Sequence, residues 1–435
     1  MTAIWDDLPS PVEAAATAQH IRDRMRGLRF TPEQERTAIR PVVLPAETRT
    51  AVHDAMEGLV RLLHKICWSL TDDPRELVQR AGLLPYQVPL LGAGGTSHEI
   101  EFSASNARGD TVLRDGVPLF VECNFGVANG GPVTAHYLIA AYRDLFGMEP
   151  TRAGNEPAEP LEGWVRMYER ICAEKGLKRS VVNVGTMRDS DIPDRWYYDA
   201  ESEYLKNHGF ESAFVEPEFF DSPKSGRPSF DIGLKNFLPE DWRKLGISWD
   251  GIARAHQSTL FMVPDSGLAL SSKLVLAWLS EGSVPLTADE RAFVDRHIPW
   301  TRLMRAGSTE HEGTEKNLID LAVMRQRDFV LKPINSAGGK GVMVGRSSDP
   351  GEWKNRLQMA SETRDHVLQE YVQADHMEMD YYNARTGRVE RTGVSYILGP
   401  YAVDGICSGS TIRHVPLGKT EVVSFHRGAC INMIY

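Results

Sequence analysis

The chain has 435 residues, of which 42% are hydrophobic and 25% are charged, and its formal net charge is −10 at pH 7. This length exceeds that of one average domain, so we expect two or three domains with sizeable hydrophobic cores. The acidic balance argues against a dedicated nucleic-acid binder and against a general affinity for anionic membranes, although it permits an anionic substrate in a local basic pocket.

We expect neither a membrane span nor a secretory signal. The longest apolar runs, such as residues 268–279, are interrupted and too short to span a bilayer. The first residues, MTAIWDDLPSP, lack the basic, apolar and small-residue pattern of a signal peptide. The five cysteines form no CxxC pair, so we expect reduced thiols in a cytoplasmic protein.

Residues 1–92 are predicted to be mainly helical. Apolar residues recur at three- and four-residue spacing over residues 11–28 and 45–70. The segment contains no cluster of catalytic residue types. We therefore expect it to pack against the remaining chain and to form a wall of the substrate site.

A β-hairpin is predicted over residues 100–125, with its turn at residues 114–116. Glu122 and Asn124 lie two positions apart on its second strand, so their side chains point to the same face. Asp110 lies on the first strand and can face them. Two carboxylates and an amide oxygen suit a Mg²⁺ ion that bridges nucleotide phosphates. Exposure of Glu122 and Asn124 on a solvated edge strand is the alternative.

An α/β unit is expected over residues 151–270. Helices are predicted at residues 162–175 and 199–208, and strands at residues 180–184 and 212–216. Strand–helix–strand connections of this length favour a small parallel sheet.

Two helices are predicted next. Ser271 or Ser272 caps the first helix, LALSSKLVLAWLSE, beside Lys273. The second helix, LTADERAFVDRHIPWT, ends before Pro299. The charged segment STEHEGTEKN, at residues 308–317, is predicted to be a mobile loop.

The sequence RDFVLKPINSAGGKGVMVG predicts a strand, a glycine-rich loop and a second strand. Lys332 ends the first strand, where a cation can meet an anion. Gly338, Gly339 and Gly341 give a hairpin tip at which backbone N–H groups can approach a phosphate. An ordinary turn beside a solvated lysine is the alternative. The loop lacks the GKS or GKT of a P-loop, and a strand rather than a helix follows it.

A short apolar strand that carries Gln369 and Glu370 is predicted after this hairpin, and the tail beyond it alternates in the manner of strands. Glu378 can accept hydrogen bonds from a ribose. Asp375 and Asp380 compete with it for that role.

These pieces together resemble the ATP-grasp superfamily. The resembling pieces are the lysine and glycine-rich hairpin, the later QEYV strand, the E-x-N motif in FVECN and the R-x-D motif in NARGD. In most members E-x-N follows the lysine hairpin, whereas here it precedes the hairpin. This reversed order is similar to the circularly permuted branch, which contains eukaryotic-type glutathione synthetase and glutathionylspermidine synthetase.

The resemblance implies an α+β, circularly permuted ATP-grasp fold with a helical N-terminal block and a small inserted α/β domain. The expected divisions are residues 1–150 for the helical region with the metal-motif strands, 151–270 for an α/β substrate-binding domain, and 271–435 for the nucleotide-binding region with its lid hairpin.

The resemblance also implies a site for ATP and Mg²⁺. Lys273 and Lys332 would contact the phosphates, with Lys316 as a rival of Lys273. Arg108 would stabilise an acyl phosphate and the developing oxyanion, and Arg413 would contact the substrate or a phosphate. The implied metal ligands are Asp110, Glu122 and Asn124. The implied nucleotide contacts are Gly338, Gly339, Gly341, Gln369, Glu370, Tyr371, Val372 and Glu378.

One position departs from the family pattern. Eukaryotic-type glutathione synthetase carries a metal-binding glutamate four residues after the hairpin lysine, and this chain has Ser336 there. Asp110 is expected to supply the third ligand instead.

The family resemblance implies an ADP-forming carboxylate–amine ligase that acts through an acyl phosphate on small amino-acid-like substrates. The expected partners are a small-molecule carboxylate and an amine, without nucleic acid or membrane, and a homodimer is kept open. Two alternatives remain, which are a phosphotransferase acting on a small molecule and a non-catalytic nucleotide-binding protein.

Overall fold

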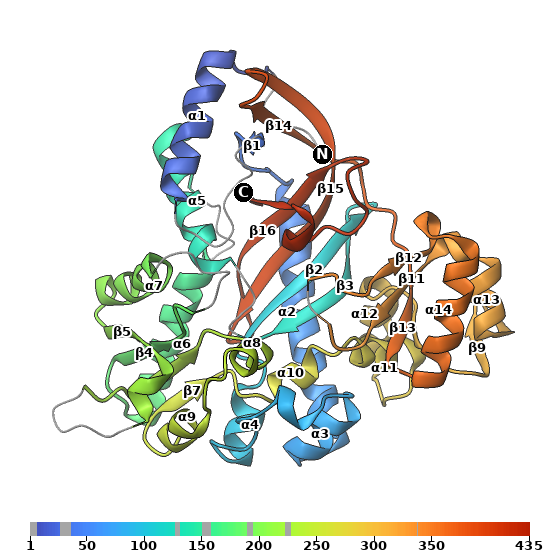
Figure 1. Ribbon diagram of the computed structural model, residues 1–435, viewed down its shortest axis with the longest axis horizontal. Coiled ribbons are helices and arrows are strands. Elements are labelled where there is room, and N and C mark those ends of the chain that lie inside the picture. The colour runs from blue at the N-terminus through green and yellow to red at the C-terminus, as the bar shows by residue number, and fades with distance from the viewer. Residues whose placement is uncertain are drawn as a thin grey trace.

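The computed structural model describes residues 7–26, 36–126, 131–149, 158–188, 195–221, 228–336 and 338–435, apart from the side chain of His426. Figure 1 shows a long antiparallel sheet in the middle of the molecule. A parallel sheet with its helices lies on one side of it, and a smaller antiparallel sheet with further helices lies on the other. The fold therefore mixes helices and sheets, as the sequence predicts.

The central sheet has seven strands and joins distant parts of the chain. Its order is β1-β14-β15-β16-β17, and β2 pairs with both β15 and β3. The bounds are β1 Arg36–Ala38, β2 Asn106–Arg114, β3 Val117–Phe125, β14 Glu378–Asn383, β15 Arg388–Val403, β16 Ile406–Pro416 and β17 Cys430–Met433. The predicted hairpin around residues 114–116 is confirmed as the β2–β3 pair.

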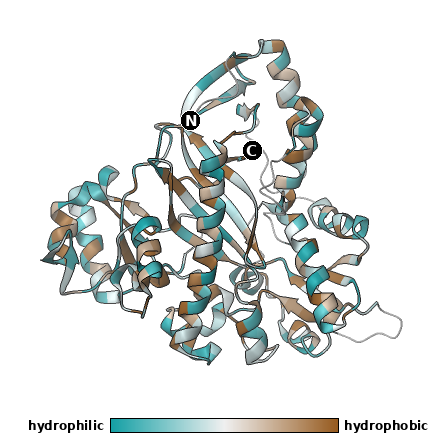
Figure 2. Ribbon diagram, turned by 180° about the vertical axis from the view of Figure 1, so that it is seen from behind, coloured by the Kyte–Doolittle hydropathy of each residue, from teal (hydrophilic) through white to brown (hydrophobic). Residues whose placement is uncertain are grey.

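Helices from the N-terminal region cover this sheet. The long helix α2 (Ala46–Leu70) buries Met56, Leu59 and Leu63 at three- and four-residue spacing, and it packs against β3, β15 and β16. Figure 2 shows hydrophobic residues along the strands beneath this helix. The other helices of the region are α1 Pro11–Arg24, α3 Pro74–Arg80, η1 Pro85–Gln87, α4 Thr96–Phe102 and α5 Pro132–Phe146. The prediction that residues 1–92 are mainly helical is confirmed for residues 7–26 and 36–92, and residues 27 and 28 of the predicted stretch 11–28 lie outside the described residues.

The predicted α/β unit is also confirmed. Its four strands are parallel and lie in the order β5-β4-β6-β7. The strands are β4 Ser180–Val184, β5 Glu211–Val215, β6 Ile232–Lys235 and β7 Leu260–Met262, and the helices are α6 Pro160–Lys175, α7 Trp196–Asn207, η2 Pro217–Phe220, α8 Pro239–Lys244, α9 Asp250–Ala255 and α10 Gly267–Leu270.

The third unit contains a four-stranded antiparallel sheet in the order β12-β11-β13-β8. Its strands are β8 Thr301–Leu303, β11 Phe329–Pro333, β12 Met343–Val344 and β13 His366–Glu370, and its helices are α11 Lys273–Glu281, α12 Ala288–His297, α13 Leu318–Met324, η3 Gln326–Asp328, η4 Gly345–Ser347 and α14 Pro350–Thr363. Ser272 caps α11 and Thr287 caps α12, which confirms both predicted helix starts.

One prediction about this unit is wrong. Residues 308–317 form a hairpin of β9 (Ser308–His311) and β10 (Thr314–Asn317) rather than a mobile loop. The turn places Glu312 at φ 51° and Gly313 at φ 70°, the left-handed pair that suits a two-residue hairpin turn. Thr309 and His311 alternate inward, so local pairing orders a segment whose charge had suggested a loop.

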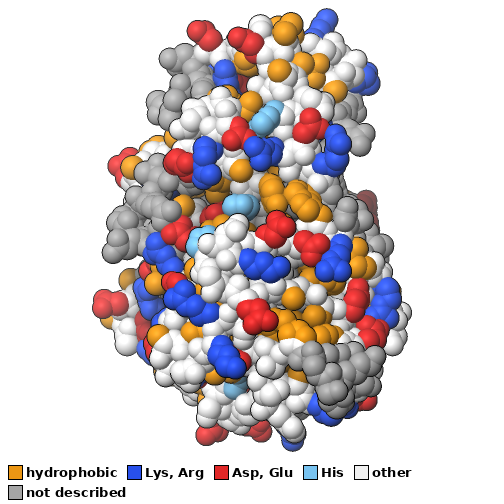
Figure 3. Space-filling view, turned by 90° about the vertical axis from the view of Figure 1, so that its left-hand side faces the viewer, with side chains coloured by type: hydrophobic (Ala, Val, Ile, Leu, Met, Phe, Trp, Pro, Cys, Tyr) orange, Lys and Arg blue, Asp and Glu red, His pale blue; other side chains and the backbone are white. Residues whose placement is uncertain are grey.

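Among the described residues, no helix is long and apolar enough to cross a membrane. All five cysteines are buried, and no disulfide joins them in the described structure. On the face shown in Figure 3, basic and acidic side chains alternate around small hydrophobic groups. Arg24 of α1 forms an ion pair with Asp144 of the neighbouring helix α5.

Candidate active site

The β2–β3 hairpin brings the predicted metal motif together. In the strand register Asp110 lies opposite Glu122, and Arg108 lies opposite Asn124. Nδ2 of Asn124 lies 3.5 Å from Oδ1 of Asp110. The sequence prediction that Asp110 can face the E-x-N motif is therefore confirmed, because paired residues of an antiparallel ladder project to the same face.

Two arginines approach Asp110 from different strands. Nη2 of Arg413, on β16, lies 2.5 Å from Oδ1 of Asp110, and Nη2 of Arg108 lies 3.4 Å from the same oxygen. Burial alone would raise the pKa of Asp110, but the two guanidinium groups outweigh burial and hold that pKa below its ordinary value. Asp110 is thus a carboxylate between two cations.

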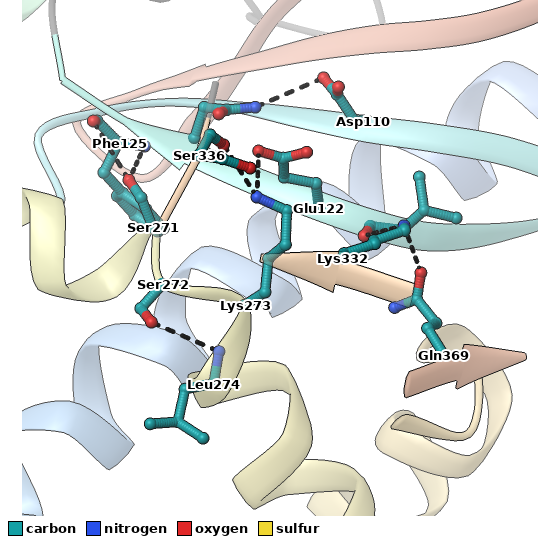
Figure 4. A network of polar contacts seen from close by, with 12 residues as sticks. Asp110, Glu122, Phe125, Ser271, Ser272, Lys273, Leu274, Lys332, Ser336 and Gln369 are labelled. Carbon is teal, nitrogen blue, oxygen red and sulfur yellow. Dashed lines mark hydrogen bonds and ion pairs between the residues drawn. The ribbon is translucent and has the colours of Figure 1, made fainter. Parts of the chain in front are cut away.

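Lys273 reaches the same site from the start of α11. Its Nζ lies 3.0 Å from Oε1 of Glu122 and donates a 3.0 Å hydrogen bond to the carbonyl oxygen of Ser336 (Figure 4). The Ser272 side chain caps this helix and so fixes the direction in which Lys273 leaves the backbone. Lys316, its rival in the sequence, lies on β10 and pairs there with Thr309.

Lys332 is the second buried lysine. It is 8% exposed, and its Nζ donates to Oε1 of Gln369 at 2.6 Å and to the carbonyl oxygen of Val121 at 3.2 Å (Figure 4). Burial lowers its pKa to about 8, and the charge of Lys273 adds to this shift while Glu122 opposes it. Lys332 therefore has two neutral hydrogen-bond acceptors and no ion-pair partner among the residues that the structure describes.

These side chains surround a cavity of about 340 Å³ between the central sheet and the four-stranded sheet. Charged side chains and two glycines of the glycine-rich hairpin belong to its lining. The lining also includes a group of aliphatic side chains, called here the aliphatic slot, which are Val112, Val330, Val344, Val372 and Ile397, and three of them, Val112, Val372 and Ile397, pack together.

Most of the predicted site residues line this cavity. The lining includes Arg108, Asp110, Glu122, Asn124, Lys332, Gly338, Gly339, Gln369, Glu370, Tyr371, Val372 and Arg413. Lys273 and Gly341 lie behind the lining, Lys273 bound to the lining residue Glu122. Glu378 also lies outside it and faces His376 at 3.5 Å, whereas its rival Asp375 lines the cavity.

The hairpin tip needs its glycines. Gly338, Gly339 and Gly341 have φ values of 67°, 74° and 73°, which other residues rarely adopt. A Cβ atom on Gly339 would lie 2.7 Å from Cγ1 of Val422. The hairpin thus packs closely against the connection between β16 and β17.

The sequence analysis assigned no role to that connection, yet Glu421, Val422, Val423 and Ser424 line the cavity. Ser424 is 4% exposed, and its Oγ has no hydrogen-bond partner within the described residues. The segment has no motif, and only its long-range contact with the hairpin identifies it.

The donor set suits Mg²⁺ with retained water ligands. Asp110, Glu122 and Asn124 offer two carboxylates and an amide oxygen on one face. Across the described chain, no group of three or more His, Cys, Asp or Glu side chains is close enough to hold a metal ion.

No protein-family model and no curated protein matches this chain. Among solved structures, a glutathione synthetase-like effector from Globodera pallida, in its apo form, aligns with a TM-score of 0.59 at 8% identity and covers 99% of this chain and 98% of its own. A putative gamma-glutamylcysteine synthetase from Methylobacillus flagellatus KT gives a TM-score of 0.43 at 12% identity, covering 91% and 89%. D-cycloserine synthetase gives 0.29 at 16% identity, covering 57% and 73%. The last two similarities are too weak to carry an argument, and the first shows that this chain shares its fold with a glutathione synthetase-like protein.

Proposed function

We propose that the protein is an ATP-dependent, ADP-forming ligase that joins a carboxylate to an amine through an acyl phosphate. One observation carries the proposal. Four cationic side chains, two carboxylates and an amide gather at one cavity beside a glycine-rich hairpin, and the same cavity is lined by the aliphatic slot. A nucleoside triphosphate has matching parts, a flat base and anionic phosphates.

The slot would hold the base. Val330 and Val344 lie on one sheet and Val112 and Ile397 on the other, so apolar side chains can contact both faces of a planar ring. Backbone groups around Tyr371 would supply hydrogen bonds to its edge.

The charged side chains would hold the phosphates. Lys332 is buried and donates to the neutral oxygens of Gln369 and Val121, so a phosphate would give it an anionic partner, and Lys273 would turn from Glu122 toward a phosphate. Backbone N–H groups of Gly338 and Gly339 would approach the terminal phosphate. Asp110, Glu122 and Asn124 would hold Mg²⁺, which supplies charge neutralisation at the transferring phosphoryl group when it is bound.

Arg108 and Arg413 would bind the oxygens of the substrate carboxylate beside the terminal phosphate. Their pairing with Asp110 fixes both guanidinium groups before the substrate arrives, so little reorganisation is needed as negative charge develops. Closure of the hairpin against Val422 would exclude water from an acyl phosphate. The scheme needs no covalent enzyme nucleophile.

The overall fold supports this proposal, since it is shared with a glutathione synthetase-like protein. The substrates are proposed only as a class, a small amino-acid-like carboxylate and an amine.

The test is ADP release from Mg²⁺-ATP across a panel of amino acids and small carboxylates, alone and paired with amines. The proposal predicts ADP only with a carboxylate–amine pair, together with a product lighter than the pair by one water. A stable product that carries a phosphoryl group, formed without an amine, would instead establish a phosphotransferase.

A further inference from the structure

Arg346 lies behind the cavity wall, in the turn η4 that follows the glycine-rich hairpin. Its guanidinium carbon lies over the Tyr371 ring, 3.5 Å from the ring centre. Its Nη1 donates a 3.1 Å hydrogen bond to Oε1 of Gln373. Tyr371 and Gln373 line the cavity, whereas Arg346 does not. Arg346 thus contacts the cavity lining through these two residues.

Residues 326–328 hold both Arg346 and Tyr371 in place through hydrogen bonds to the backbone around them. Nε2 of Gln326 donates to the carbonyl oxygens of Gly345 and Ser348, each at 2.8 Å. A Cβ atom on Gly345 would lie 1.9 Å from the Gln326 carbonyl oxygen, so this approach requires glycine. Two residues further on, the Asp328 carbonyl oxygen accepts the Tyr371 amide at 2.7 Å. The turn η4 and residues 371–373 are thus held in a fixed position relative to each other before any ligand binds.

The chain leaves the four-stranded sheet immediately after this wall. The Asp375 carboxylate accepts the amides of Asp115 and Gly116, at 2.8 and 2.9 Å, and its own amide donates to the Leu113 carbonyl oxygen at 2.7 Å. Asp375 is therefore bound to the β2–β3 hairpin of the central sheet. Residues 371–374 thus connect the end of β13 at Glu370 to the central sheet, and Val372 already packs there with Val112 and Leu119.

We propose that Arg346 is a positioning residue for the nucleotide base. By covering one face of Tyr371 and binding Gln373, it holds residues 371–373 in the orientation that accepts the base, and it couples this wall to the glycine-rich hairpin through β12. A guanidinium group suits this role because it is always charged, weakly hydrated and attracted to aromatic faces. The inference rests on the proposed nucleotide site and adds a residue that sets the affinity of this site for the base.

The test compares ATP with inorganic tripolyphosphate, which presents phosphates but no base. Arg346→Ala should weaken ATP binding about tenfold, as expected for loss of a partly desolvated cation–π contact and a hydrogen bond, and should leave tripolyphosphate binding unchanged. Arg346→Lys keeps the charge and should recover part of the loss. The control is Arg305→Ala, an exposed arginine of the same unit, which should change neither ligand.

Hydrogen exchange of the ligand-free protein gives a second readout. Arg346→Ala should speed exchange of the Tyr371 amide, because the wall loses its outer support. Equal losses of ATP and tripolyphosphate binding would show a general structural role and overturn the inference, as would unchanged ATP binding with unchanged exchange. A wild-type protein that binds neither ligand would overturn the proposed function itself, and the base-side role with it.

Discussion

Replacing Lys332 with methionine separates nucleotide binding from folding. Lys332 is buried, and within the described residues its ammonium group donates hydrogen bonds to the neutral oxygens of Gln369 and Val121. Methionine keeps the apolar stem and removes the charge. We predict that Lys332→Met weakens ATP binding by about 10- to 100-fold, since a hydrogen bond to a charged group contributes about 1.5–3 kcal/mol.

The free energy of unfolding should change little at pH 7, because two effects oppose each other. Burial lowers the pKa of Lys332 from 10.5 to about 8, so the charged form costs the folded protein about 3 kcal/mol. The variant removes this cost but leaves the Gln369 and Val121 oxygens without their donor, at about 1–3 kcal/mol.

The lowered pKa of Lys332 also makes the free energy of unfolding depend on pH. Above pH 10.5 the lysine is neutral in both states and contributes nothing. As the pH falls toward about 8, the unfolded chain gains the proton and the folded protein does not, so the wild-type protein loses stability there. The Lys332→Met variant has no amine to titrate at this position, so this decrease in its free energy of unfolding should be absent.

Calorimetric titration with ATP and denaturant unfolding between pH 7 and pH 10 measure both effects. The control is Lys354→Met, an exposed lysine of α14, which should behave as the wild type. A Lys332→Met variant with normal ATP affinity would refute the reasoning, and so would one that loses much stability, because Lys332 would then be a structural group.

Three further predictions address the carboxylates and the arginines. Glu122→Gln keeps a hydrogen-bonding partner for Lys273 but replaces an anionic metal ligand with a neutral amide oxygen, so steady-state ADP release should fall more than about 100-fold while ATP binding survives weakly; unchanged release would remove Glu122 from the metal site. Arg108→Ala should lower ligation far more than ATP affinity, and selective loss of ATP binding in titrations would count against an oxyanion role. Burial raises the pKa of Glu201 from 4.5 to about 8, so the folded form holds its proton more tightly and stability should decline as the pH rises from 4.5 through 8. Glu201→Gln should flatten that decline in denaturant unfolding, and an unchanged profile would contradict the assignment.

Local patterns in the sequence predicted the parts of the site that lie on single elements. Glu122 and Asn124 share a face because strand side chains alternate, and glycines mark the hairpin tip because positive φ values favour them. The capped start of α11 follows from Ser272 in the same way. These features depend on neighbours in the sequence, so one sequence suffices to find them.

Contacts between distant elements could not be predicted from the sequence. Neither the ion pair of Lys273 with Glu122 nor the contact of Gly339 with Val422 has a local signature, because each joins elements brought together only by the packing of separate units. The β9–β10 hairpin was missed for another reason. Its charged residues suggested a solvated loop, although the Glu312–Gly313 turn and the inward Thr309 and His311 carry a hairpin signal.

The central claim is that phosphate transfer from ATP activates a carboxylate. Once a carboxylate–amine pair is found, the carboxylate can be labelled with ¹⁸O and the released phosphate analysed by mass spectrometry. An acyl-phosphate route predicts one ¹⁸O atom in the inorganic phosphate, because the carboxylate oxygen leaves with it when the amine attacks. Phosphate without label, or label in AMP, would contradict the account.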